Sequence, residues 1–138
     1  MSIRSLRRNH RGSALVEVAI TIPILLAILL GIFEFARAWN IQQVVTNAAR
    51  EGARVAVVPT ATTALIQTAV ENHLTAANVD VSGATISIFN TTVPGDPDSV
   101  VVSYNYQYQL FGKVIGFLGG GGAASSVNLS STSIMRNE

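Results

Sequence analysis

Residues 7–33 read RRNHRGSALVEVAITIPILLAILLGIF, a cluster of cations followed by an apolar run in which Glu17 is the only charge. The run from Ala14 to Phe33 is twenty residues long, which is enough for an α-helix to cross the roughly 30 Å of hydrocarbon in a bilayer. A charge at the centre of a bilayer costs roughly 2.5 to 3.5 kcal/mol, so an acidic residue here is a functional hypothesis by default. The surrounding sequence must therefore supply a partner for Glu17.

The basic residues are concentrated before this run. The positive-inside rule predicts that residues 1–12 stay in the cytoplasm and that the chain after Phe33 faces outward. A chain without residues 1–12 would hold five basic and eight acidic residues, a net charge of −3, and would have no basic surface with which to bind nucleic acid. Four of the nine basic residues precede the run, namely Arg4, Arg7, Arg8 and Arg11.

The composition limits the chain to one small module. Of its 138 residues, 49% are hydrophobic and 12% are charged, and that charged fraction is about half the usual value for soluble domains. About 80 residues remain outside the membrane, enough for a single small domain. The absence of cysteine excludes disulfides and thiolate metal sites. These features are more typical of a protein that lies partly in lipid or packs against copies of itself than of an ordinary cytosolic enzyme.

The helix is expected to continue beyond the membrane. Residues 34–58 read EFARAWNIQQVVTNAAREGARVAVV and contain no proline. Apolar and small side chains recur there at steps of three and four residues, as on one face of a helix. Trp39 falls where an aromatic anchor at the membrane interface belongs. The predicted stripe comprises Phe35, Trp39 or Ala38, Ile41, Val45, Ala48, Ala49, Gly52 and Ala56, and the predicted i, i+3 ion pairs are Glu34 with Arg37 and Glu51 with Arg54.

The second half of the chain predicts a short helix and strands. Pro59 ends the long helix, and Thr60 is the expected N-cap of an amphipathic helix within residues 61–78. Residues 79–83 then turn the chain. The following segments with strand-like alternation are residues 84–93, 100–111 and 126–135, with the turn sequence PGDPDS at residues 94–99 and a glycine-rich loop at Gly112 to Gly122.

These elements predict an α+β fold with a long N-terminal helix, a second short helix and a small antiparallel sheet of about three strands. Tyr104, Tyr106 and Tyr108 share one face of the second strand. We expect this face to pack against the long helix. The apolar residues within Gly112 to Gly122 are compatible with a return towards the membrane, a place in the core or contact with a partner.

Three interpretations account for RGSALVE, residues 11–17. In the first, the chain is an uncleaved single-pass anchor whose Glu17 snorkels to the headgroups. In the second, the run is a secretory signal peptide cut after Ala36-Arg37-Ala38, although a long apolar region with an acid inside fits that class poorly. In the third, a membrane peptidase cuts after Gly12 and frees the α-amine of Ser13, which is mostly protonated at neutral pH.

We favour the third interpretation because it gives Glu17 a partner. After the cut, the Ser13 amine and the Glu17 carboxylate lie about one helical turn apart at the edge of the lipid. Each charge is costly there alone and less costly as a pair. The two groups can meet within one chain, or set the axial register between staggered neighbours.

RGSALVEVAI resembles the signal that prepilin peptidases cut in the type IV pilin superfamily, with Gly12 before the cut and Glu17 at the fifth mature position. The wider pattern, which includes GIFEFARAW, TNAAREGARVAVV and the terminal STSIMRNE, resembles the TadE-like family of minor pilins or pseudopilins of tight-adherence pili. The match is dense over residues 8–58 and thin over residues 59–126. Val18 departs from the family pattern, since many such proteins have an aromatic residue after the glutamate, and this bears on peptidase efficiency.

The resemblance implies a structural protein of a type IVc pilus that takes part in pilus assembly or initiation. Its partners would be the prepilin peptidase, other pilin subunits and the pilus assembly platform. It would reside in the bacterial inner membrane with its N-terminus in the cytoplasm, and after processing it could enter an extracellular pilus used in cell adhesion. The segments are then a cleaved basic leader at residues 1–12, a transmembrane segment at 13–33, an extracytoplasmic helix at 34–58 and an α+β head at 59–138.

Small residues in the span are expected to allow close helix packing in lipid, while Glu17 sets the register. We expect no catalytic, metal or cofactor site and no small-molecule substrate, since His10 and His73 lack acidic or cysteine companions at ligand spacing. The nearest alternative is an uncleaved, permanently anchored binding module outside the cytoplasm. The small packing residues are Ala14, Ala19, Ala27 and Gly31.

Overall fold

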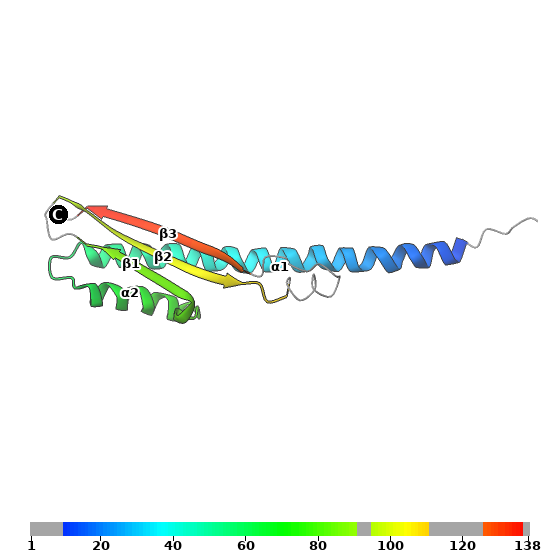
Figure 1. Ribbon diagram of the computed structural model, residues 1–138, viewed down its shortest axis with the longest axis horizontal. Coiled ribbons are helices and arrows are strands. Elements are labelled where there is room, and N and C mark those ends of the chain that lie inside the picture. Colours follow the sequence, from blue (N-terminus) through cyan, green and yellow to red (C-terminus); the bar gives the residue numbers. More distant parts are fainter. Residues whose placement is uncertain (1–9, 91–94, 111–125, 137–138) are drawn as a thin grey trace, which may run out of the picture.

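The computed structural model describes residues 10–90, 95–110 and 126–136, with side chains from Gly12 onward. Helix α1, His10–Ala56, runs along most of the molecule without a break at Pro23. Its 47 residues correspond to a rod about 70 Å long at about 1.5 Å per residue. The N-terminal half of α1 projects alone, whereas its C-terminal half lies against the remaining elements (Figure 1). The rest of the leader and the loop at 112–122 lie outside the described residues.

The head is built from one further helix and one sheet, as the α+β expectation required. Helix α2, Thr63–Ala76, is followed by the 3-10 turn η1, Val81–Gly83. The antiparallel sheet has the order β1-β2-β3. Its strands are β1, Ala84–Phe89, β2, Pro97–Gln107, and β3, Ser126–Arg136.

Local hydrogen bonds explain where α2 begins and ends. The expected cap at Thr60 was wrong, because the N–H of Ala61 donates to the carbonyl of Val58 at 2.8 Å and closes a turn there. Thr62 caps α2 instead, accepting from the N–H of Leu65 at 3.3 Å. At the other end Asn78 has a φ of 57°, a left-handed conformation that asparagine tolerates at a helix C-terminus. The chain then turns towards β1.

The core lies where α1, α2 and the sheet meet. On α1 the buried side chains are small, and this allows the backbones of α2 and β2 to approach closely. The two helices and the central strand thereby share one apolar cluster. Its buried members are Val45, Ala48, Ala49, Ala53, Ala56, Ile66, Val70, Leu74, Val79, Val100 and Val102.

Gly52 marks the tightest approach in this core. A Cβ added there would lie 2.6 Å from Cγ2 of Val70 and 3.1 Å from Cγ1 of Val100. Both valines are fully buried, so neither can move aside freely. Only glycine fits this position without a shift of its neighbours.

We therefore expect Gly52→Ala to lower the free energy of unfolding by about 1 to 2 kcal/mol, the overpacking cost less the gain in helix propensity. Urea unfolding of the full chain in detergent micelles, followed by circular dichroism, measures this change. Asn47→Ala, on the exposed side of the same helix, is the control and should be neutral or slightly stabilising. Unchanged stability of Gly52→Ala would contradict the packing described.

Two features of the predicted pattern differ in the structure. Phe35 was expected in the buried stripe, but it is 68% exposed, and Glu34 occupies the buried position with 3% exposure. The second strand was expected to continue through Leu110, but β2 ends at Gln107 and Leu110 is 44% exposed. Glu34 accepts a hydrogen bond from the N–H of Leu110, in the segment that follows β2.

Candidate functional site

The N-terminal half of α1 has an apolar surface that nothing in the described protein covers. Every residue from Gly12 to Leu26 is exposed, and Ala27 and Gly31 are half-buried. The helix is long and apolar enough to cross a membrane, and its most apolar stretch is not buried. This surface is compatible with a single-pass membrane anchor, since lipid is the solvent that would cover it without cost.

The residues expected for processing and assembly lie at the start of this surface. Gly12, Ser13 and Glu17 are exposed on α1, and Ser13 and Glu17 are separated by about one helical turn. The small residues expected in helix packing also lie on α1, where Ala14 and Ala19 are exposed. The helix therefore exposes Gly12, Ser13, Ala14, Glu17 and Ala19, whereas Ala27 and Gly31 are half-buried.

A second site, which the sequence did not reveal, holds the head to α1. Glu34 Oε2 accepts from the hydroxyl of Tyr106 at 2.8 Å, and Glu34 Oε1 accepts from the N–H of Leu110 at 2.7 Å. Beside it, Nη1 of Arg37 donates to Oε1 of Gln109 at 2.9 Å. We call these five residues the Glu34 cluster.

The Glu34 cluster replaces the ion pair expected between Glu34 and Arg37. Glu34 lies four residues before Ala38 and seven before Ile41 on the buried side of α1, a spacing that could have signalled its burial. Its partners come more than seventy residues later in the chain. The other expected pair is confirmed, with Arg54 Nη2 at 2.6 Å from Glu51 Oε1.

The electrostatics of the Glu34 cluster fix its protonation. Burial raises the pKa of the Glu34 carboxyl, but the hydrogen bonds from Leu110 and Tyr106 and the charge of Arg37 together outweigh burial, and the pKa falls below its ordinary 4.5. Burial and the hydrogen bond to Glu34 raise the pKa of Tyr106 from 10.0 to about 12. At neutral pH the carboxylate is therefore ionised and the phenol is a donor.

Trp39 lies on α1 just beyond the Glu34 cluster. It is 58% exposed, and its ring stacks on that of Phe35 with centroids 6.2 Å apart and an interplanar angle of 28°. Tyr106 is almost completely buried against α1 and meets Tyr108 edge-on at 5.6 Å. The expected contact between the tyrosine face and the long helix is thus confirmed for Tyr106.

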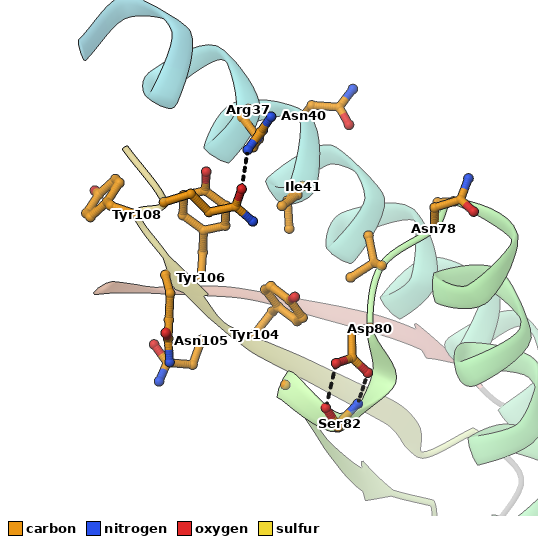
Figure 2. A pocket seen from close by; sticks show the side chains of 15 residues that line it. Arg37, Asn40, Ile41, Asn78, Asp80, Ser82, Tyr104, Asn105, Tyr106 and Tyr108 are labelled. Atoms are coloured by element: carbon orange, nitrogen blue, oxygen red, sulfur yellow. Dashed lines mark hydrogen bonds between the residues drawn. The ribbon is translucent and has the colours of Figure 1, made fainter. Parts of the chain in front are cut away.

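A groove of about 980 Å³ opens beside the Glu34 cluster, between α1, the connection from α2 to β1 and the end of β2. Tyr104 and Tyr106 point from β2 towards α1, whereas Asn105 points away (Figure 2). Because β1 begins opposite Tyr104, residues 105–107 pair with β3 on one side and border the groove on the other. Asp80 fixes the rim by accepting from the N–H and hydroxyl of Ser82.

The groove offers aromatic rings, amides, Arg37 and Asp80 to a ligand. Within residues 10–90, 95–110 and 126–136, no group of three or more His, Cys, Asp or Glu side chains could hold a metal ion. The side chains that line the groove are suited to contact with a polar ligand.

A family model described as TadE-like protein matches residues 12–54 of the chain. The N-terminal region is TadE-like. The match covers α1 almost to its end, so it includes Glu17, Glu34 and Trp39, and it confirms the resemblance recognised in the sequence. TadE-like proteins are pilin-like proteins associated with tight-adherence pili, and they are known as structural proteins rather than as enzymes. No curated protein and no solved structure matches the chain.

Proposed function

We propose that this TadE-like protein is a structural minor pilin or pseudopilin that a prepilin peptidase cuts after Gly12. The observation that supports this most is the exposed apolar half of α1, which begins with Gly12, Ser13 and Glu17 and coincides with the TadE-like match. Both residues that flank the bond after Gly12 are exposed at the start of α1.

Cleavage would give Glu17 its partner. The new amine of Ser13 carries a positive charge near neutral pH, and one helical turn separates it from the Glu17 carboxylate. Within one chain the pair lowers the cost of holding both charges at the edge of the lipid. Between chains the same pair sets their axial register, while Ala14, Ala19, Ala27 and Gly31 permit close helix contacts.

The leader and the apolar segment also support the proposed location. Residues 1–12 are basic, so they remain in the cytoplasm, and the head faces outward from the bacterial inner membrane. Residues 13–33 cross the membrane, residues 34–58 continue the helix outside and residues 59–138 form the head. The proposed partners are the prepilin peptidase, other pilin subunits and the assembly platform, and nucleic acid is not among them.

The deciding experiment is the N-terminal sequence and intact mass of the protein from membranes, with and without the prepilin peptidase. We expect a chain that begins at Ser13 only when the peptidase is present. A chain that keeps Met1 under both conditions would rule out processing and leave a fixed anchor. A chain that begins at Trp39 would instead identify residues 1–38 as a secretory signal peptide.

The groove favours one alternative, an anchored binding module that never enters a filament. Its tyrosines and amides suit a polar ligand at the membrane surface. The two functions differ in cell fractionation, because surface filaments removed by shearing contain a pilin-like subunit and lack a fixed anchor.

A further inference from the structure

The apolar surface of α1 does not stop where the hydrocarbon is expected to end. Residues 13–33 account for about 30 Å along the helix axis. Beyond them, Phe35 and Trp39 are 68% and 58% exposed and stack on each other. Side chains on a helix lean towards its N-terminus, so both rings lean back towards the lipid.

The segment that follows β2 meets α1 beside these rings. Glu34 Oε1 accepts from the N–H of Leu110 at 2.7 Å, so the backbone of Leu110 lies within one side-chain length of α1 at the outer edge of the hydrocarbon. Leu110 is 44% exposed. The Glu34 cluster therefore holds a second apolar group of the head at the level of Phe35.

We propose that the head rests on the lipid headgroup layer through an interfacial belt formed by Phe35, Trp39 and Leu110, with Arg37 directed to lipid phosphates. This inference rests on the proposed function only in taking residues 13–33 as the membrane span. Glu34 is a positioning residue in the belt, because it holds Leu110 without touching lipid itself.

The chemistry of the belt fits this layer. Tryptophan rings concentrate at the membrane interface, where one part of the ring is apolar and the N–H is hydrated. Arg37 uses Nη1 for Gln109, and a guanidinium carries five N–H donors in a geometry that suits phosphate. The belt continues directly from the apolar surface of α1, and for this reason we assign it to lipid rather than to a protein partner.

The chain has one tryptophan, so fluorescence can measure the depth of two belt positions, Trp39 and Leu110. The full chain is placed at one copy per nanodisc of phosphatidylcholine and phosphatidylglycerol, with bromine near the headgroup or at the end of the acyl chain. Wild type reports on Trp39, and Trp39→Phe with Leu110→Trp reports on the segment that follows β2. The control is Trp39→Phe with Phe89→Trp, because Phe89 is 61% exposed and Asn90 beside it bonds the far end of α1.

We expect bromine near the headgroup to quench the fluorescence of wild type and of the Leu110→Trp reporter strongly. Bromine at the end of the acyl chain should quench both weakly. The Phe89→Trp control should lose no fluorescence with either lipid. Adding Glu34→Ala should abolish quenching of the Leu110→Trp reporter and preserve that of Trp39 in wild-type background. Glu34→Gln keeps a hydrogen-bond acceptor, so it should restore quenching of the Leu110→Trp reporter. This variant controls for misfolding caused by the loss of Glu34.

The other outcomes are equally informative. An unquenched Leu110→Trp reporter beside a quenched Trp39 would overturn the belt and leave the membrane anchor intact, with a neighbouring subunit as the occupant to test next. If Trp39 also escaped quenching by both lipids, the belt would fail as a whole, because neither reporter would lie near the headgroups. Quenching of the Leu110→Trp reporter that survives Glu34→Ala would remove Glu34 from the positioning role.

Discussion

Glu34→Ala is expected to lower the free energy of unfolding of the full chain in detergent micelles by about 2 to 4 kcal/mol. The substitution leaves the hydroxyl of Tyr106, a residue with 4% exposure, without its acceptor, and it also removes the bond to Leu110. Hydrogen bonds to charged groups contribute about 1.5 to 3 kcal/mol, and a buried unsatisfied donor costs about 1 to 3 kcal/mol. Urea unfolding followed by near-ultraviolet circular dichroism, which detects the tyrosines of the head, measures the loss.

The loss of stability in Glu34→Ala should become smaller as the pH falls. The pKa of folded Glu34 lies below the ordinary value of 4.5, so ionisation stabilises the fold fully above about pH 4.5 and this contribution is lost as the pH falls through the folded pKa. The difference between wild type and Glu34→Ala should therefore shrink below that pH, whereas Glu34→Gln should show no such dependence. Glu51→Ala, which removes an ion pair with the exposed Arg54, is the control and should change stability little. An equal loss in both alanine variants would disprove a special role for Glu34.

Glu17→Leu is expected to leave cleavage after Gly12 intact and to remove the protein from sheared filaments. Without the carboxylate, the amine of Ser13 has no partner at the edge of the lipid, and an unpaired charge there costs up to roughly 2.5 to 3.5 kcal/mol. We therefore expect the filament fraction to fall by at least about tenfold, which corresponds to 1.4 kcal/mol. Immunoblots of the sheared and membrane fractions, with an N-terminal sequence of each, measure both steps.

The matched control for Glu17→Leu is Thr21→Leu. Thr21 is another exposed polar residue in the apolar run, one helical turn further on. This variant should be processed and assembled as wild type, because it carries no charge to be paired. Filaments that contain Glu17→Leu at the wild-type level would refute the pairing, and loss of cleavage in this variant would move the role of Glu17 to peptidase recognition.

The sequence predicts the helices and strands well because their signals are local. Twenty residues from Ala14 with a single charge predict a helix apolar enough to cross a membrane, and the three- and four-residue spacing of alanines specifies the face of α1 that meets the head. Alternation in residues 84–89 likewise predicts the half-buried side of β1. Each of these signals lies within the element that it describes.

The sequence does not predict contacts whose partners are distant in the chain. Glu34 and Phe35 are adjacent, and hydrophobicity favours the aromatic ring for the buried position, although the spacing to Ala38 and Ile41 places Glu34 on the buried face. Glu34 is buried instead because Tyr106 and Leu110 supply its hydrogen bonds, and no local pattern reports them. The roles of Gly12, Ser13 and Glu17 depend on a peptidase and on neighbouring chains, so they stay predictions from sequence.

Helix α1 joins the proposed membrane span to the head without an interruption. The head is fixed to this rod at two places, the Glu34 cluster and the apolar core around Val45 and Ala53. Torque applied to one end is therefore transmitted to the other, and rotation of the span about its axis turns the head with it. In an assembly, the direction in which Glu17 points would then determine the direction in which the tyrosine-lined groove opens, so that contacts made in the lipid orient a surface outside it.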